Sequence, residues 1–300
     1  MNKLLFTGAS GFLGKNTLPI LREKYIVETL GLTQEESFSC NLVTEVPRFV
    51  EKYDIVLHAA GKAHSIPKTE AEKKVFFDVN YEGTKNLCKG LEKVGAPRSF
   101  IFISTVAVYG CDTGKLIDED HLLKGESPYA LSKIYAERFL QDWAAKNGPV
   151  LSIIRPSLIA GPNPPGNLGA MIRGIKTHRY LSIAGGKARK SVLMVQDIAN
   201  LIPLLAEKGG VYNVCDSHHP TFRELEELIA EQLEKKTPAN IPLWGAFCLA
   251  KVGDCMGRYA PINSDRLEKI IEPLTFSNAK IKRELKWEPI PVLEHFKIDE

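Results

Sequence analysis

The chain has 300 residues, 44% of them hydrophobic and 25% charged, which is enough apolar material for one large core or two smaller ones. Its net charge of +3, with no run of like charges, argues against a nucleic-acid partner. No apolar run could span a bilayer and no signal peptide precedes the first strand, so we expect a cytoplasmic protein without a membrane partner. The six scattered cysteines form no CxxC pair, and we expect free thiols and no metal site.

The first half of the chain alternates short apolar runs with helical patterns, which is typical of βαβ units and a parallel sheet. The expected strands are Lys3–Thr7, Tyr25–Leu30, Ile55–His58, Ser99–Ser104 and Val150–Arg155. The expected helices are Leu13–Lys24, Val46–Lys52, a long one at Glu70–Val94 and another at Pro128–Asn147.

The texture changes after Arg155, because the sequence GPNPPG at 161–166 fits neither a helix nor a central strand. We interpret it as the crossing into a second, smaller domain. A strand at Gly210–Val214 is expected to return to the first sheet. The remaining expected helices are Phe222–Leu233, Pro242–Met256, Leu267–Ile271 and Asn278–Leu285. The apolar helix 242–256 is expected to serve core or domain packing rather than membrane contact.

A glycine-rich turn, Gly8-x-x-Gly11-x-x-Gly14, lies between the first strand and the first helix. Its first glycine permits a tight turn, the second lets the backbone approach a phosphate, and the third lets the helix pack closely on the sheet. This geometry aims a helix N-terminus at a pyrophosphate, and the position at a strand–helix junction disfavours an unrelated glycine turn. The run 59–61 ends the third strand in small residues, which either leave room for a ligand or pack closely.

The end of the second strand should carry an acidic residue for the adenosine ribose of a dinucleotide. Glu28 lies too early in the strand, and Gly31 stands where the acid is expected. No arginine follows that could hold a 2′-phosphate. The sequence therefore favours NAD as the cofactor and leaves NADP open.

Tyr129 and Lys133 lie four residues apart on one face of an expected helix. A free tyrosine has a pKa near 10, and an adjacent ammonium group lowers it, so the pair could exchange a proton with an alcohol or sugar hydroxyl. Ser104 and Thr105 end a buried strand and could supply a hydroxyl to the reacting oxygen. An exposed helical pair without chemistry is the alternative.

Taken together, these segments resemble the extended short-chain dehydrogenase/reductase family of nucleotide-sugar epimerases and dehydratases, over nearly the whole chain. The resemblance rests on the runs 7–14, 58–61, 80–84 and 104–110, the Tyr129/Lys133 pair and Arg155-Pro156. It implies an α/β fold, with a Rossmann-type doubly wound parallel sheet in a dinucleotide-binding domain at 1–160, a return segment at about 190–215 and a smaller C-terminal α/β substrate-binding domain at 161–300. It also implies that Thr105 is the hydroxyl partner, Tyr129 the acid/base and Lys133 the residue that binds ribose and tunes Tyr129. The implied cofactor-binding residues are Gly8, Ser10, Gly11, Phe12, Leu13, Gly14, Asn41, Leu42, Ala59, Ala60, Gly61, Asn80, Ser104, Tyr129, Lys133 and Pro156.

Three further runs, 61–64, 165–168 and 185–191, resemble the branch that acts on UDP-N-acetyl-hexosamines and their 4-keto-6-deoxy derivatives. Asn167 then resembles the residue that opens a helix beneath the substrate diphosphate. Lys190 stands where the family has a diphosphate-binding arginine, and its neighbour Arg189 could share or exchange that role. The implied substrate-binding residues are Lys62, Asn167, Arg189 and Lys190, with Arg258 and Arg266 as further diphosphate candidates. A solvated basic loop is the alternative interpretation.

The resemblance implies hydride transfer at C4 of a UDP-hexose or UDP-N-acetyl-hexosamine, with epimerisation and reduction of a 4-keto sugar both open. It argues against 4,6-dehydration, because the Asp-Glu pair of dehydratases is replaced by Val106 and Ala107. It also implies a homodimer formed through the helices at 70–94 and 128–147. A catalytically silent dinucleotide sensor or scaffold is the rival function, and the intact Thr105, Tyr129 and Lys133 disfavour it.

Overall fold

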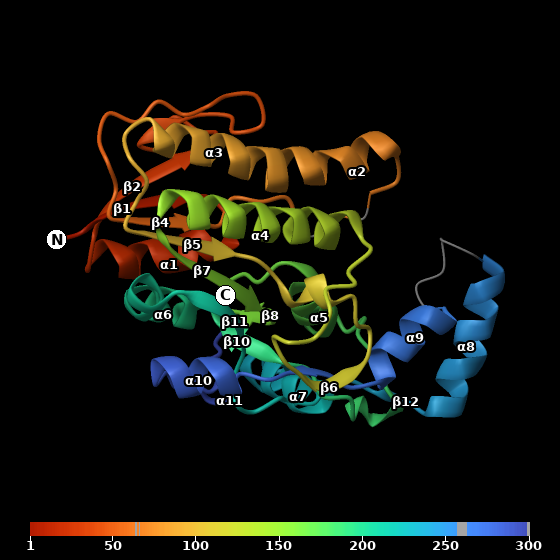
Figure 1. Ribbon diagram of the computed structural model, residues 1–300. Helices are drawn as coiled ribbons and strands as arrows, with labels where there is room; N and C mark the ends of the chain where they lie inside the picture. Colours follow the sequence, from red (N-terminus) through yellow and green to blue (C-terminus); the bar gives the residue numbers. More distant parts are fainter. Residues whose placement is uncertain (64, 66, 257–262, 299–300) are drawn as a thin grey trace.

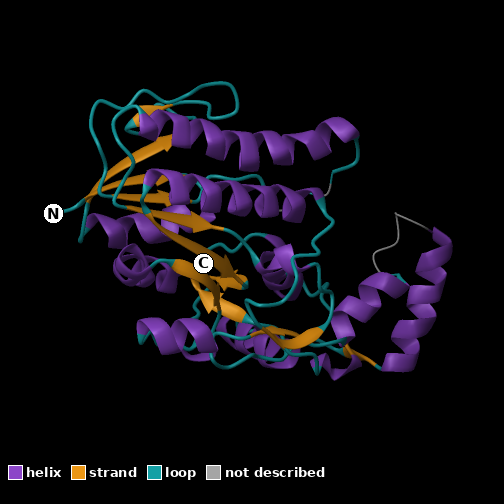
Figure 2. Ribbon diagram, viewed as in Figure 1, coloured by secondary structure: helices purple, strands orange, loops and turns teal. Residues whose placement is uncertain are grey.

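The computed structural model describes residues 1–63, 65, 67–256 and 263–298. Its centre is a parallel sheet of seven strands in the order β11-β7-β5-β4-β1-β2-β3 (Figures 1 and 2). The strands are β1 (Lys3–Thr7), β2 (Ile26–Gly31), β3 (Phe38–Ser39), β4 (Ile55–His58), β5 (Ser99–Ile103), β7 (Val150–Pro156) and β11 (Gly210–Val214). The chain order reverses between β1 and β4, which is the switch point where doubly wound sheets bind ligands. The expected α/β fold is therefore confirmed, including the return of 210–214 to the sheet.

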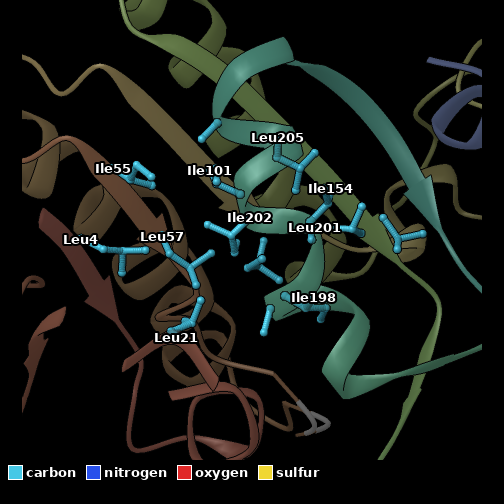
Figure 3. Packing of buried hydrophobic residues seen from close by; sticks show 14 of the residues in the cluster. Leu4, Leu21, Ile55, Leu57, Ile101, Ile154, Ile198, Leu201, Ile202 and Leu205 are labelled. Carbon is cyan, nitrogen blue, oxygen red and sulfur yellow. The ribbon is translucent and has the colours of Figure 1, made fainter. Parts of the chain in front are cut away.

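Helices cover both faces of this sheet (Figure 1). One face carries α2 (Glu70–Phe77), α3 (Gly83–Glu92) and α4 (Pro128–Asn147), and the other carries α1 (Phe12–Arg22) and α6 (Val195–Lys208). Figure 3 shows the packing on the face that carries α1 and α6, where buried leucines and isoleucines of α6 contact apolar residues of the strands. A sheet that is buried on both faces explains why its strands read as nearly continuous apolar runs.

Two expectations about local structure were wrong, and one helix was not expected. Residues 46–52 are not helical, because the segment packs extended against α3: a Cβ on Gly90 would lie 2.6 Å from the Pro47 carbonyl oxygen, and Phe49 enters the core. The helix at 70–94 is interrupted by a π-helical turn, η1 (Asp78–Glu82). Helix α6 was not expected, because a short apolar run fits a buried strand and a buried helix equally well.

The chain after residue 156 builds smaller units below the sheet in Figure 1. Many of their apolar residues form clusters of their own, whereas Ile281, Leu285 and Trp287 pack into the same cluster as α6 and the seven-stranded sheet. Three two-stranded pairs join β8 (Leu158–Ala160) to β10 (Val192–Met194), β9 (Ser182–Ile183) to β12 (Asn240–Ile241), and β6 (Gly114–Ile117) to β13 (Leu274–Phe276). The helices are α5 (Gly166–Lys176), α7 (Phe222–Gln232), α8 (Leu243–Met256), α9 (Ser264–Ile271), α10 (Ala279–Leu285) and α11 (Val292–His295).

Candidate active site

The glycine turn forms a cradle that side chains would fill. Gly8 has φ of +82°, and a Cβ on it would lie 2.6 Å from the Ala60 backbone nitrogen. A Cβ on Gly14 would lie 2.2 Å from the Ala9 carbonyl oxygen. Gly11 is the N-cap of α1 and provides no side-chain cap, so amides of the first turn are open to an anion. These residues fit the pyrophosphate of a dinucleotide.

A buried histidine links the glycine turn to the end of β4. The His58 ring nitrogens lie 2.6 Å from Thr7 Oγ1 and 2.8 Å from Thr84 Oγ1. The Thr84 hydroxyl donates to the Asn80 carbonyl, so it must accept from His58, whose Nε2 therefore carries the proton. Burial lowers the pKa of His58 to about 3, so the ring stays neutral. Thr7 Oγ1 also accepts the Ala60 N–H, which fixes the backbone beside Gly8.

The π-helical turn holds the loop after β4. The Asn80 side chain accepts the Lys62 N–H at 2.7 Å and donates to the Lys62 carbonyl at 3.1 Å, as a neighbouring strand would. It also donates to the Ser132 hydroxyl on α4. A π-helical turn places a residue where a regular helix could not, and such turns are frequent at functional sites. Asn80 therefore connects the loop at Gly61 to the helix that carries Tyr129.

Thr105 and Tyr129 meet at the carboxyl end of β5. The Thr105 hydroxyl accepts the Ala107 N–H at 3.2 Å, and its side chain lies close enough to that of Tyr129 to affect the pKa of the phenol. Burial raises the pKa of Tyr129, and the Thr105 side chain acts in the opposite direction. Lys133 is not among the causes of the shift in the Tyr129 pKa, so its expected effect on Tyr129 stays a prediction.

Lys133 points from α4 toward the sheet. Its Nζ donates to the Ile103 carbonyl at 2.8 Å and lies 4.6 Å from the centre of the Phe102 ring. A Cβ on Gly61 would lie 3.2 Å from the same nitrogen. Burial lowers the pKa of Lys133 to about 8. The ammonium group thus lies between the end of β5 and the loop after β4, where the sequence predicts the cofactor ribose.

A series of buried hydrogen bonds begins at Ser104, next to Thr105, and leads away from the site to Asn213. The Ser104 hydroxyl donates to Glu137, one helical turn beyond Lys133. Glu137 forms a bidentate ion pair with Arg155 at 2.6 and 3.1 Å. Arg155 donates to the Tyr109 hydroxyl at 3.0 Å, and Tyr109 donates to Asn213 at 2.6 Å. Because Ser104 gives its proton to Glu137, its hydroxyl faces any ligand as an acceptor only.

The end of β2 at Gly31, where the adenosine ribose is expected to bind, lies beside an acid that sequence reasoning missed. Glu28 is engaged elsewhere, since it pairs with Lys3 at 2.9 Å and accepts from the Tyr53 hydroxyl. A Cβ on Gly31 would instead lie 2.8 Å from Glu36 Oε1, so the loop after β2 returns a carboxylate to the expected place. A pair of acids in that loop, Glu35 and Glu36, was the available signal.

The remaining cofactor candidates lie in the loops and turns at the carboxyl ends of the sheet strands. The Asn41 side chain accepts the Val43 N–H and thus shapes its own turn, while Leu42 is buried against α3. A Cβ on Gly161 would lie 3.6 Å from the Phe12 ring, which joins the start of α1 to the crossing segment. Pro156 ends β7. Ser10 is exposed at the turn, and Leu13 packs partly into the core below it.

The substrate candidates divide among several elements. Asn167 lies exposed in the first turn of α5, whose N-cap Pro165 provides no side-chain cap. Arg189 donates to the His219 carbonyl, whereas Lys190 donates to the carbonyls of residues 269 and 272 at the end of α9. The two neighbours therefore contact different elements. Lys62 is exposed, Arg266 lies in the first turn of α9, and Arg258 is outside the described residues.

A pocket of about 510 Å³ is lined in part by Glu272, whose carbonyl accepts from Lys190. Its walls come from the loop at 183–188, the start of α8 and the end of α9. The Asn240 side chain accepts the Gly185 N–H at 2.7 Å and shapes this loop. Within the described ranges, no helix could cross a bilayer and no cluster of three potential metal ligands occurs.

Comparisons with known proteins agree with this geometry. The chain is 27% identical over 301 aligned residues to the N-acetyl-alpha-D-glucosaminyl-diphospho-ditrans,octacis-undecaprenol 4-epimerase of Escherichia coli O157:H7, covering 93% of this chain and 88% of the relative. It is also 27% identical to the UDP-glucose 4-epimerase of Vibrio cholerae, covering 97% and 92%. In fold it is similar to RMD from Pseudomonas aeruginosa complexed with NADPH, with a TM-score of 0.75, 23% identity and coverage of 99% and 96%.

Residues 4–215 match the sequence profile of the NAD dependent epimerase/dehydratase family. This match spans the glycine turn, the histidine link, the Tyr129 helix and the return strand. The chain therefore belongs to the NAD dependent epimerase/dehydratase family, and it is an NAD-dependent enzyme of the extended short-chain dehydrogenase/reductase type.

Proposed function

We propose that the enzyme transfers hydride at C4 of a UDP-hexose or UDP-N-acetyl-hexosamine, as a 4-epimerase or as a 4-ketoreductase. The observation that carries the proposal is the proximity of the Thr105 and Tyr129 side chains at the carboxyl end of β5, with Lys133 one turn along α4. A dinucleotide held at the glycine turn would supply the hydride acceptor and donor for this reaction. Tyr129 takes the proton of the O4 hydroxyl when C4 is oxidised and returns it when the ketone is reduced, while Thr105 hydrogen-bonds the same oxygen.

The substrate side would be formed by the residues after the crossing segment, as a domain at 161–300. The uncapped first turn of α5 at Asn167 favours an anion, as a diphosphate requires. The pocket of about 510 Å³ at the end of α9 is large enough for a nucleoside. This arrangement supports a nucleotide end held near α8 and α9 and a pyranose that reaches toward Tyr129.

A hexosamine carried on a polyprenyl diphosphate is a second candidate substrate. It would present the same diphosphate and C4 hydroxyl. The relative from Escherichia coli bears a name of this kind, and α8, which begins at the pocket, exposes large apolar side chains. An exposed apolar surface beside the site favours a substrate with an apolar tail.

Isotope transfer tests the reaction. UDP-sugars and 4-keto-6-deoxy UDP-sugars are incubated with the enzyme and with NADH or NADPH whose transferable hydride is deuterium. Stoichiometric deuterium at C4 supports the reductase, and interconversion of C4 epimers without net cofactor consumption supports the epimerase. If only a small alcohol or another nucleotide sugar reacts, the proposal of C4 chemistry on UDP-sugars is wrong. A polyprenyl-diphosphate hexosamine in a parallel reaction tests the second candidate.

The choice of cofactor follows from the end of β2 at Gly31. The Glu36 carboxylate beside Gly31 would accept hydrogen bonds from ribose hydroxyls and would repel a 2′-phosphate. We therefore propose NAD as the preferred cofactor. Direct titration of both cofactors by calorimetry tests this preference without any substrate.

We also propose the homodimer that the resemblance implied. The surface of α4 exposes Tyr135, whose ring lies 5.9 Å from that of Phe77 and 5.7 Å from that of Tyr81. An exposed aromatic cluster over the helices α2 and α4 is suited to a two-fold contact.

A further inference from the structure

Helix α8 packs with its large side chains outward. The face that contacts the protein consists of Ala246, Ala250 and Gly253, spaced at helical intervals. The opposite face carries Trp244, Phe247 and Val252, which are 73%, 47% and 60% exposed. This is the reverse of the pattern of a surface helix, which buries its large apolar residues and exposes its polar ones. The exposed face therefore requires an apolar partner.

This outward face is mainly apolar and includes Lys251, which follows Phe247 and Cys248 by four and three residues. Trp244, Cys248, Val252 and Cys255 follow one another at spacings of four, four and three residues, and Phe247 lies one turn after Trp244 at the edge of this stripe. Leu243 and Leu249 flank it and are also exposed. The helix contains two charged residues, Lys251 and Asp254, which lie 3.7 Å apart and offset each other. Helix α8 stands at the outer end of the structure beside α9, away from the sheet (Figure 1).

The size of α8 suits a surface-lying helix. Its 14 residues would extend about 21 Å, which is too short to span a bilayer. An interfacial helix lies in the membrane plane with one apolar face, often containing Trp and Phe, among the acyl chains. Here the protein body, attached through the small residues, takes the place of the polar face. The long stem of Lys251 could let its ammonium group reach the headgroups.

The chain segments on both sides of the β9–β12 pairing, from which α8 begins, are strongly positive. The segments 173–190 and 233–256, which are joined through the pairing of β9 with β12, contain nine Lys and Arg residues and two acids, a net charge of +7. The whole chain is +3, so all other residues together carry −4. Eight of these nine basic side chains are exposed, all except that of Lys190. Such an asymmetry complements an anionic lipid surface.

A second copy of the chain fits α8 less well. A stable interface uses roughly 20–30 residues from each partner, far more than the single stripe on α8. Two copies of so basic a region would also repel each other. The aromatic surface at Tyr135 lies on α4, over the sheet, and offers a separate contact for a homodimer (Figure 1).

We propose that α8 is an interfacial helix that docks the enzyme on an anionic bilayer, with the basic segments at 173–190 and 233–243 contacting lipid headgroups. The proposal replaces the sequence-based expectation that 242–256 is a packing helix without a membrane partner. It does not depend on the substrate, but it places the pocket at the base of α8 next to the headgroup layer.

Trp244 gives a direct test, because the other two tryptophans, Trp143 and Trp287, are 4% and 5% exposed. The full chain is mixed with phosphatidylcholine vesicles that contain phosphatidylglycerol, with or without brominated acyl chains. We expect a blue shift of the Trp244 emission, quenching by bromine and co-sedimentation that weakens as salt increases. Neutral phosphatidylcholine vesicles should bind at least about tenfold more weakly, since the electrostatic attraction is missing.

Variants separate this docking from loss of folding. The change Trp244→Ser with Phe247→Ser should reduce vesicle binding at least about tenfold while the circular dichroism spectrum stays the same, because both side chains are exposed. Trp244→Phe should retain co-sedimentation and lose the fluorescence response. Val50→Ser and Leu122→Ser, at positions 87% and 66% exposed elsewhere, are the matched controls. Absence of binding to anionic vesicles overturns the proposal. So does a mass by light scattering that falls in the Trp244/Phe247 variant, because α8 would then cover a second copy.

Discussion

The Glu36 carboxylate lies over Gly31, with its Oε1 2.8 Å from the point where a Cβ on Gly31 would be. Gly31 ends β2, where dinucleotide-binding folds commonly place the acid that contacts the adenosine ribose. The acid thus comes from a loop instead of the strand, and the missing side chain of the glycine makes room for it.

Replacing Glu36 should change the cofactor preference. In Glu36→Gln we expect the Kd for NAD to rise by about tenfold, because an ionised acceptor forms the stronger hydrogen bonds to the ribose hydroxyls. Glu36→Arg should in addition improve NADP binding, since an arginine can hold a 2′-phosphate. Calorimetric titration with both cofactors measures the change, and Glu35→Gln is the matched control from the same loop. Unchanged NAD affinity in Glu36→Gln would show that the carboxylate does not contact the cofactor.

Tyr129 should be required for turnover but not for cofactor binding. Tyr129→Phe removes the phenol and keeps the ring, so we expect turnover to fall by on the order of a hundredfold or more. Thr105→Val should also reduce turnover, since it removes the hydrogen bond to the reacting oxygen. Tyr135→Phe is the control, because Tyr135 lies on the outer face of the same helix. Isotope transfer to C4, with the cofactor bound beforehand, measures the turnover of each variant. Near-normal turnover in Tyr129→Phe would contradict the acid/base role.

The enzyme should not dehydrate a simple nucleotide hexose. That reaction must move protons at C5 and C6, and the two residues after Thr105 in the turn at the active site are Val106 and Ala107, which have no titratable group. We expect no 4-keto-6-deoxy product from UDP-glucose, UDP-N-acetylglucosamine or dTDP-glucose under conditions where C4 chemistry proceeds. Mass spectrometry would reveal such a product as a loss of water.

The features that could be predicted from the sequence are local ones. The turn at Gly8 and the Tyr129/Lys133 spacing each depend on a few adjacent residues, and helix α4 has both a Ser127 N-cap and a Gly148 C-cap. The proximity of Thr105 and Tyr129 could also be predicted, because the carboxyl ends of parallel strands lie at one edge of the sheet.

The features that could not be predicted depend on contacts between distant parts of the chain. Lys190 donates to carbonyls about 80 residues further along the chain. The residues around Lys190 therefore do not indicate that its ammonium group is hydrogen-bonded at the end of α9. Glu36 lies in an irregular loop whose return to β2 no periodicity indicates. The apolar pattern of 242–256 predicts a helix, and the structure confirms it. Which face of this helix is exposed depends on its packing against α9, which the pattern does not indicate.

The homodimer should depend on Tyr135. Its ring is exposed and belongs to the aromatic cluster with Phe77 and Tyr81 on neighbouring helices. Tyr135→Asp would bring a charge into the contact, whose desolvation is unfavourable, so we expect the mass at micromolar concentration to fall from dimer to monomer. Light scattering after gel filtration measures it, with Leu122→Asp as the control on another surface. A wild-type protein that is monomeric would contradict the prediction.

Stability should decrease as the pH rises toward neutrality because of one buried carboxyl group. Asp197, at the start of α6, accepts the Ile290 N–H at 3.2 Å, and Asp216 nearby accepts the Val292 N–H at 2.8 Å. Burial raises the pKa of Asp197 to about 7, and the charge of Asp216 adds to the effect. An unfolded aspartate has a pKa of about 3.9, so between these values the folded state binds more protons than the unfolded state.

The free energy of unfolding therefore contains a contribution from Asp197 that is fully present below about pH 4 and is lost as the pH rises through about 7, by at most about 1.4 kcal/mol per pH unit. Asp197→Asn cannot ionise but keeps an acceptor for the Ile290 N–H. We expect this variant to be less sensitive to pH between 5 and 8 than the wild type in urea unfolding at constant ionic strength. Asp54→Asn, at the partly buried start of β4, is the control. If wild type and Asp197→Asn lose stability in parallel over this range, Asp197 is ionised in the folded protein and the prediction is wrong.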